Sequence, residues 1–152
     1  MTDRKGDQKT RITRPRIEIF LYTVAALIAV IGLSEAIYLT VTFLTGELAV
    51  CGGSNGCMEV LGSKFARVRG IPIAAFGAAA YFAAFSCATF AAFGYARARK
   101  LFAVVVGGMF LFTLWLLFVQ AFLLHAFCKY CLFSAAMIFL LTAIGVSRPV
   151  SD

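Results

Sequence analysis

Two pairs of cysteines are the residues of this chain best suited to chemistry. Cys128 and Cys131 form a Cys-x-x-Cys set between the last two long apolar runs. This spacing, and a position in the first turn of a helix, lower the pKa of a thiol and favour reversible disulfide exchange. Cys51 and Cys57 flank the glycine-rich segment 52–56, in the longest polar connection of the sequence. If both pairs lie at one membrane surface, electrons can pass between them by thiol–disulfide exchange.

Two other interpretations of these cysteines stay open. Each pair could be a structural disulfide, although two such pairs on one small surface are hard to explain when lipid already holds the helices. A zinc site of four thiolates is the second, but the five residues between Cys51 and Cys57 exceed the usual gap of two to four. Cys87, alone within an apolar run, is interpreted as a packing residue.

The composition indicates a membrane protein. Of the 152 residues, 62% are hydrophobic and only 14% are charged, which does not suit an ordinary soluble domain. The net charge of +7 comes from short basic clusters beside apolar runs, a pattern typical of membrane topology signals, and we expect no nucleic-acid partner. The predicted transmembrane spans are 17–44, 71–95, 101–127 and 128–146.

The segments between and beside the spans are also predicted. Residues 1–16 and 147–152 are cytoplasmic tails, and the basic first tail is expected to be disordered. Residues 45–70 form a connection on the outer side, with a short helix near 58–65. Pro72 is expected in the first turn of the second span, where its missing N–H is not needed.

Basic residues predict the orientation. Four spans put both termini on one side, and that side carries ten Lys and Arg residues against four on the other. By the positive-inside rule the termini are cytoplasmic, so both cysteine pairs face outward. We therefore expect a multi-pass protein of the inner (plasma) membrane, with thiols exposed to a compartment where disulfides form and persist.

The ordered set of cysteines on four spans resembles the bacterial form of the vitamin K epoxide reductase family. The match rests on Cys51 and Cys57 in the outer connection, Ser63 six residues later, and Cys128 and Cys131 at the fourth span. It covers essentially residues 17–146. The resemblance implies an all-α fold, a bundle of four transmembrane helices around a quinone, with the outer connection capping the redox site.

The same resemblance implies a set of roles. Cys51 and Cys57 would take electrons from a thioredoxin-like partner, Cys57 would attack Cys128, and Cys131 would be the thiolate that passes electrons to quinone. Ser63 would orient the connection near the site. The quinone would be ubiquinone or menaquinone. The activity implied is that of a quinone-dependent thiol:disulfide oxidoreductase, which reoxidises its partner and so supports disulfide formation in secreted proteins.

Two departures from the family pattern bear on the expected partner and on the expected reaction. Only six residues follow Val146, so the thioredoxin-like partner would be a separate periplasmic protein. Animal members contact the quinone carbonyls through an Asn and a Tyr, and those positions here are Ile73 and Ala135, whose side chains cannot hydrogen-bond. Simple quinone reduction is therefore favoured over epoxide reduction, although reduction of a quinone or an epoxide for its own sake stays open as the physiological task.

Several span residues could also serve the site. A quinone ring would stack on aromatic residues of the third and fourth spans; the candidates are Phe110, Phe118, Phe122 and Phe133. Glu35, a carboxyl within the first span, is a candidate for proton transfer or is held neutral by a hydrogen bond to Tyr38. His125 either tunes Cys128 or lies at headgroup level. For Gln120 and Trp115, packing is favoured over lining a pocket.

Overall fold

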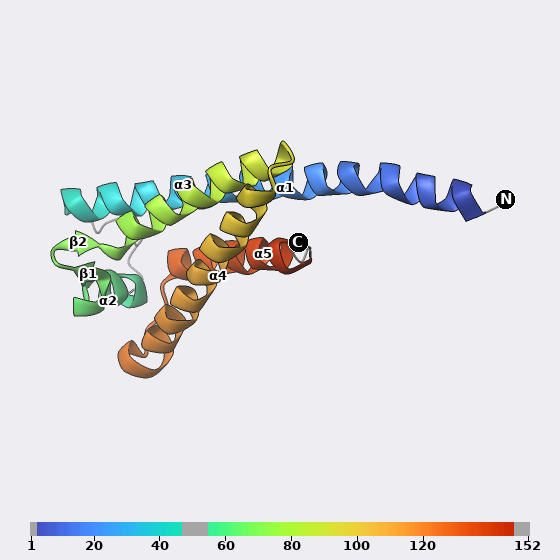
Figure 1. Cartoon of the computed structure of the whole chain (residues 1–152). Helices are drawn as coiled ribbons and strands as arrows, with labels where there is room; N and C mark the ends of the chain where they lie inside the picture. Colours follow the sequence, from blue (N-terminus) through green and yellow to red (C-terminus); the bar gives the residue numbers. More distant parts are fainter. Residues whose placement is uncertain (1–2, 47–54, 148–152) are drawn as a thin grey trace.

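The computed structural model describes residues 3–46 and 55–147. Its elements, in chain order, are α1 (Asp3–Thr45), α2 (Asn55–Gly62), the 3-10 helix η2 (Lys64–Ala66), β1 (Arg67–Val68), β2 (Ile71–Pro72), α3 (Ile73–Ala92), α4 (Ala96–Phe118), the π-helix η3 (Val119–Leu124) and α5 (Lys129–Ser147). Figure 1 shows α1 and α3 lying side by side, α4 crossing them at an angle, and α5, which contacts α4 and α1, running roughly in the direction of α1 and crossing α4. The short elements gather beside one end of α3.

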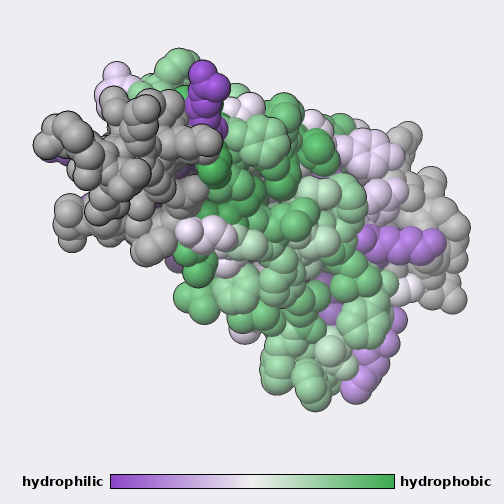
Figure 2. All heavy atoms as spheres, turned by 90° about the vertical axis from the view of Figure 1, so that its right-hand side faces the viewer, coloured by the Kyte–Doolittle hydropathy of each residue, from purple (hydrophilic) through white to green (hydrophobic). Residues whose placement is uncertain are grey.

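Within the described residues, four helical segments are long and apolar enough to cross a membrane: Arg16–Thr45, Ile73–Ala92, Ala96–Leu124 and Lys129–Ser147. Continuous helices form here because every backbone N–H and C=O in lipid needs a partner within its own segment. Large apolar side chains remain exposed along all four. Hydrophobic residues cover the middle of the face in Figure 2, as expected of a surface in contact with lipid.

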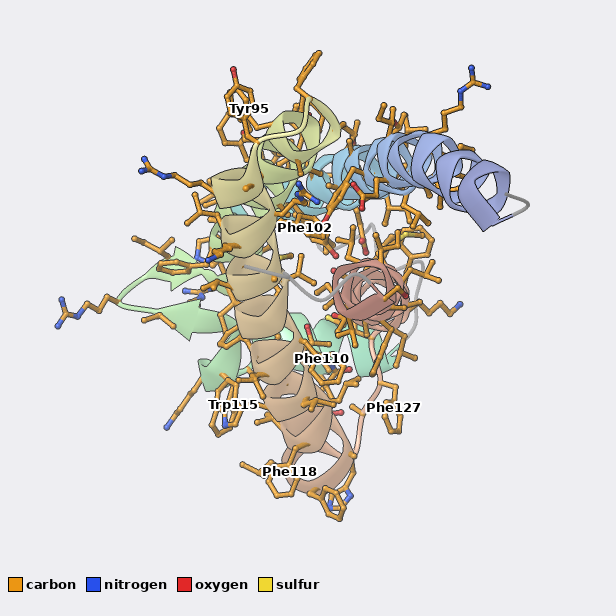
Figure 3. The ribbon with its side chains drawn as sticks, turned by 45° about the vertical axis from the view of Figure 1, so that its right-hand side comes forward. Tyr95, Phe102, Phe110, Trp115, Phe118 and Phe127 are labelled. Atoms are coloured by element: carbon orange, nitrogen blue, oxygen red, sulfur yellow. The ribbon has the colours of Figure 1, made fainter. Side chains whose placement is uncertain are left out.

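Small residues let α1 and α3 pack closely. Ala25 and Ala29 on α1, and Ala84 and Ala88 on α3, are completely buried, and each pair is spaced one helical turn apart. Without side chains beyond Cβ, the two backbones can approach and gain van der Waals contact. Phe102 of α4 is buried against the same core, as Figure 3 shows, with its ring edge-on to that of Tyr22.

The connection after α1 folds into a cap. β1 and β2 are antiparallel, with Arg67 opposite Pro72, and the turn between them has positive φ at both Arg69 and Gly70. Two such residues in succession are typical of the tight turn that suits a twisted hairpin. The Arg67 guanidinium lies 4.6 Å from the ring centroid of Phe43 and so joins the hairpin to the end of α1. The predicted capping connection is therefore present.

Some predicted boundaries were wrong. The first span, Arg16–Thr45, agrees with the predicted 17–44, but residues 3–16, predicted to be a disordered tail, continue it as helix, because extending a formed helix costs far less than nucleating one. Pro72 precedes α3 as its cap residue and ends β2 instead of lying in the first turn. The short helix predicted near 58–65 begins earlier, at Asn55, and ends at Gly62. The third span stops at Leu124, since His125 takes a left-handed conformation that ends the π-helix.

Candidate active site

A cavity of about 580 Å³ lies among the membrane-spanning helices beneath the cap. This volume falls within the range of small-molecule sites. Most of its lining is aliphatic or aromatic, from all four spans and from the cap. The side chains with polar atoms in that lining are Glu35, Ser63, Tyr81, Thr113, Gln120, Tyr130, Cys131 and Ser134. An apolar chamber with a few polar groups suits an apolar ligand that carries a small number of hydrogen-bonding atoms.

Cys128 holds the position of a helix cap. Its carbonyl oxygen accepts the N–H of Leu132 at 3.0 Å, the first such bond of α5, and its side chain is completely buried. A hydrogen bond from the Cys131 thiol, opposed by burial and aided by the backbone N–H groups of Cys131 and Tyr130, lowers the pKa of Cys128 to about 6. The thiolate thus takes the place of the side-chain oxygen that usually caps a helix.

Gln120 holds the segment that carries Cys128. Its side chain is 3% exposed, and its Oε1 accepts the Cys128 backbone N–H at 3.2 Å. Its carbonyl oxygen accepts the N–H of Ala126 at 3.2 Å. Gln120 lies in the π-helix η3, a type of distortion often found at functional sites. Gln120 thus does more than pack, as an amide in an otherwise apolar span needs a partner, and it also lines the cavity.

Cys131 lies in the first turn of α5 and contributes to the cavity wall. One turn further along, Ser134 shares a 2.8 Å hydrogen bond with the Tyr81 hydroxyl, which also donates to the Ser134 carbonyl oxygen at 3.1 Å. Tyr81 is almost fully buried on α3. These bonds fix the start of α5, and with it Cys131, against α3.

The other cysteine pair is described only in part. Cys51 lies outside the described residues, and for Cys57 the structure gives the backbone, in α2. Its neighbour Gly56 packs so closely on Phe127 that an added Cβ would lie 2.8 Å from the Phe127 carbonyl oxygen. α2 therefore packs against the residues directly before Cys128. Val60 of α2 is buried in the same apolar cluster as Cys128.

Ser63 lines the cavity from the cap side. Its hydroxyl donates to the Val60 carbonyl oxygen at 2.8 Å, and its backbone N–H bonds to the same oxygen at 3.4 Å. Ser63 therefore ends α2 and starts η2. Its predicted part in orienting the connection agrees with these contacts, while a direct contact with a ligand stays a prediction.

The predicted quinone-stacking phenylalanines do not line this cavity. Phe118 and Phe122 are 53% and 66% exposed and stack on each other with ring centroids 4.8 Å apart. Figure 3 shows Phe118 at the end of α4 that lies away from α1. Phe110 packs edge-on against Phe139, and Phe133 is exposed. Aromatic type and helix were the only signals for this choice, and they do not specify which side of a helix faces inward. The aromatic residues in the lining are Phe43, Phe65, Phe76, Phe112, Tyr81 and Tyr130.

Glu35 lines the cavity, and both of its carboxyl oxygens are buried without a hydrogen-bond partner among the described residues. The predicted bond to Tyr38 is absent there, since Tyr38 is half exposed and lies beside the Tyr130 ring. His125 is exposed at the end of η3. Cys87 packs against the core as predicted.

Trp115 is 46% exposed and stands beside Phe112, so it contributes packing and not cavity wall. Ile73 and Ala135 do line the cavity, and neither offers a side-chain hydrogen bond. Within residues 3–46 and 55–147, no three His, Cys, Asp or Glu side chains gather as a possible metal site.

Four apolar helices surround a cavity, and Cys131 of a Cys-x-x-Cys pair lines it, which is the arrangement expected of a membrane thiol oxidoreductase. The comparisons with known proteins are specific about the family. The model of the vitamin K epoxide reductase family matches residues 23–146, most of the chain, and the protein belongs to that family. No curated protein matched the chain.

Proposed function

We propose that this protein oxidises thiols of a thioredoxin-like partner and transfers the electrons to quinone through its two cysteine pairs. One observation carries the proposal. Cys128 and Cys131 stand at the start of α5 so that the first is a buried, stabilised thiolate and the second forms part of the cavity wall. A dithiol at that boundary can take electrons from the cap side and deliver them into the cavity.

The cavity fits a quinone. A quinone supplies a two-electron, two-proton acceptor, and its ring and isoprenoid tail need an apolar chamber with few polar groups. The residues that would hold it are the aliphatic and aromatic lining around Cys131, with Tyr81, Gln120 and Ser134 as the hydrogen-bonding groups. The lining residues Ile73 and Ala135 offer no such groups, which favours quinone reduction over epoxide reduction.

The proposed exchange uses the cap geometry. The partner's thiols reduce the Cys51–Cys57 disulfide, and the Cys57 thiolate then attacks the sulfur of Cys128 in the Cys128–Cys131 disulfide. A new sulfur–sulfur bond forms to Cys57, the old one breaks, and its electron pair goes to Cys131, which takes up the proton lost by the attacking thiol. Cys51 next attacks Cys57 and releases Cys128 as a thiolate. The packing of Gly56 on Phe127 brings α2 next to the residues before Cys128, which supports exchange between Cys57 and Cys128, and the low pKa of Cys128 makes it a good leaving group.

The proposal includes the orientation and the partner. The distribution of basic residues favours cytoplasmic termini, and the cap and the cysteines would then face the periplasm or the cell exterior. The partner would then be a separate thioredoxin-like protein of that compartment, and the acceptor would be the membrane's own ubiquinone or menaquinone.

The test is anaerobic quinone reduction by purified protein in detergent, with a reduced thioredoxin-like donor and quinone absorbance as the readout. Wild type should consume quinone and Cys131→Ala should not, while the matched control Cys87→Ala, which removes a thiol remote from the cavity, should resemble wild type. Absence of consumption by folded wild type over a range of quinones and thiol donors would reject the proposal and favour structural cysteines.

A further inference from the structure

The inference concerns Glu35 and rests on the function proposed above. We propose that Glu35 is a catalytic residue that stores a proton in the cavity and donates it to the quinone as the Cys128–Cys131 pair is oxidised. Cysteine exchange accounts for the electrons but leaves open which group supplies a proton deep inside an apolar chamber. Glu35 is the carboxyl group in the cavity lining.

The environment of Glu35 favours its neutral acid form. Both carboxyl oxygens are buried, and no described residue donates a hydrogen bond to either. An ionised carboxylate without donors or a paired cation is very costly in an apolar membrane interior. An ion pair on α1 joins Glu18 to Arg99 at 3.4 Å, nearly five turns away from Glu35 along that helix. Glu35 therefore rests as a carboxylic acid.

An unpartnered acid group is unusual and points to a ligand. Buried polar groups in proteins nearly always find partners, and an exception calls for a function or a bound molecule. Glu35 opens onto the cavity and lies within electrostatic range of Cys128, Cys131 and Tyr81. The missing partner of its O–H is thus explained if a carbonyl oxygen of the quinone accepts from it.

The proton balance closes with Glu35 included. The Cys128 thiolate and the Cys131 thiol form a sulfur–sulfur bond, and two electrons leave for the quinone. The Cys131 S–H bond breaks and its proton follows the electrons. Glu35 supplies the second proton, because the exchange leaves Cys128 as a thiolate without one, and becomes a carboxylate. A proton from the outer side, where the attacking thiols of Cys57 and Cys51 released theirs, restores the acid.

Two hydroxyl groups in the cavity lining that could also donate a proton to the quinone are already hydrogen-bonded. Tyr81 already shares its hydroxyl with Ser134, and the Ser63 hydroxyl is engaged by the Val60 carbonyl oxygen. These groups can orient a ligand, but giving up their proton would break bonds that hold α3, α5 and the cap. Glu35 loses no described bond when it releases a proton.

The kinetic test is a single turnover, in which reduced protein is mixed anaerobically with a soluble ubiquinone analogue. Glu35→Gln keeps the shape and neutrality of the acid but carries no transferable proton. Its rate of quinone reduction should fall about 100-fold, a typical loss for a general acid, with quinone affinity unchanged. Glu35→Asp should recover part of the rate. Thr42→Val, a buried polar change on the same helix outside the cavity lining, should keep the wild-type rate.

A second readout does not depend on turnover. Infrared difference spectra between oxidised and reduced protein should contain the C=O band of a protonated carboxylic acid in wild type, shifted in Glu35→Asp and missing in Glu35→Gln. A Glu35→Gln rate equal to wild type, or a band unchanged in that variant, would overturn the role of Glu35 while leaving the proposed function intact. No quinone reduction by wild type would instead overturn the proposed function. If Glu35→Gln fails to fold, the Glu35→Asp rate and band decide.

Discussion

Replacing Cys131 by alanine should raise the pKa of Cys128. The hydrogen bond from the Cys131 thiol is the largest influence that lowers this pKa to about 6, while the backbone N–H groups of residues 130 and 131 would survive the change. A hydrogen bond to a charged group contributes about 1.5–3 kcal/mol, and one pKa unit corresponds to about 1.36 kcal/mol. The expected rise is therefore about one to two units.

The lowered pKa makes Cys128 mostly a thiolate at neutral pH. With a pKa of about 6 for Cys128, the ratio of thiolate to thiol at pH 7 is about 10 to 1, whereas an ordinary thiol with a pKa near 8.5 gives about 1 to 30. Because the pKa of Cys128 is lower in the folded protein than in the unfolded chain, the thiolate stabilises the fold in full above the ordinary thiol pKa of about 8.5. This stabilisation is lost as the pH falls from there through about 6. Cys131→Ala should shift that loss to higher pH.

The assay is ultraviolet absorbance of the thiolate against pH, on reduced protein in detergent. The background should have Cys51, Cys57 and Cys87 replaced by alanine, so that only the pair at α5 titrates. A step near pH 6 is expected with Cys131 present, and a step at least one unit higher in Cys131→Ala. The reasoning is refuted if Cys128 titrates near 8.5 in both proteins, or if a step near 6 survives when Cys128 itself is replaced.

Three further changes test the packing around the site and its lining. Gly32→Val would place side-chain atoms inside the ring of Tyr81, because an added Cβ already lies 2.5 Å from its Cζ, and should cost about 1–3 kcal/mol, seen as a lower Tm in detergent. Gln120→Leu leaves the backbone N–H of residue 128 unsatisfied and should cost about 1–3 kcal/mol by the same measurement. Ala135→Trp fills the cavity and should weaken quinone binding at least tenfold in a fluorescence titration, while exposed Ala136→Trp should not.

Each of these has a contrasting variant. Gly77→Val should keep the Tm, since an added Cβ at Gly77 meets no atom within 4 Å, and an equal loss there would reject the packing argument. Gln120→Glu keeps an acceptor oxygen at the same place and should restore part of the Tm. A Gln120→Leu protein as stable as wild type would mean that the bond to the Cys128 N–H contributes little.

The sequence determined the fold class, because four long apolar runs in a chain rich in hydrophobic residues can satisfy their backbones in lipid only as helices. It also determined the place of the Cys-x-x-Cys pair, since Cys128 and Cys131 directly before an apolar run come at the start of the last helix. Small residues such as Ala84 and Ala88 indicated close helix packing, but not which helices would meet.

Tertiary structure decided which side of each helix faces the cavity. Nearly continuous apolar spans carry little periodicity, so aromatic type alone selected Phe118, which faces away, and missed Tyr81, which lies inside. The bond from Cys128 to Gln120 depends on a π-helical turn that no residue pattern announced. The unpartnered burial of Glu35 is likewise a property of packing, because only the neighbouring helices decide whether a carboxyl in a span meets a donor.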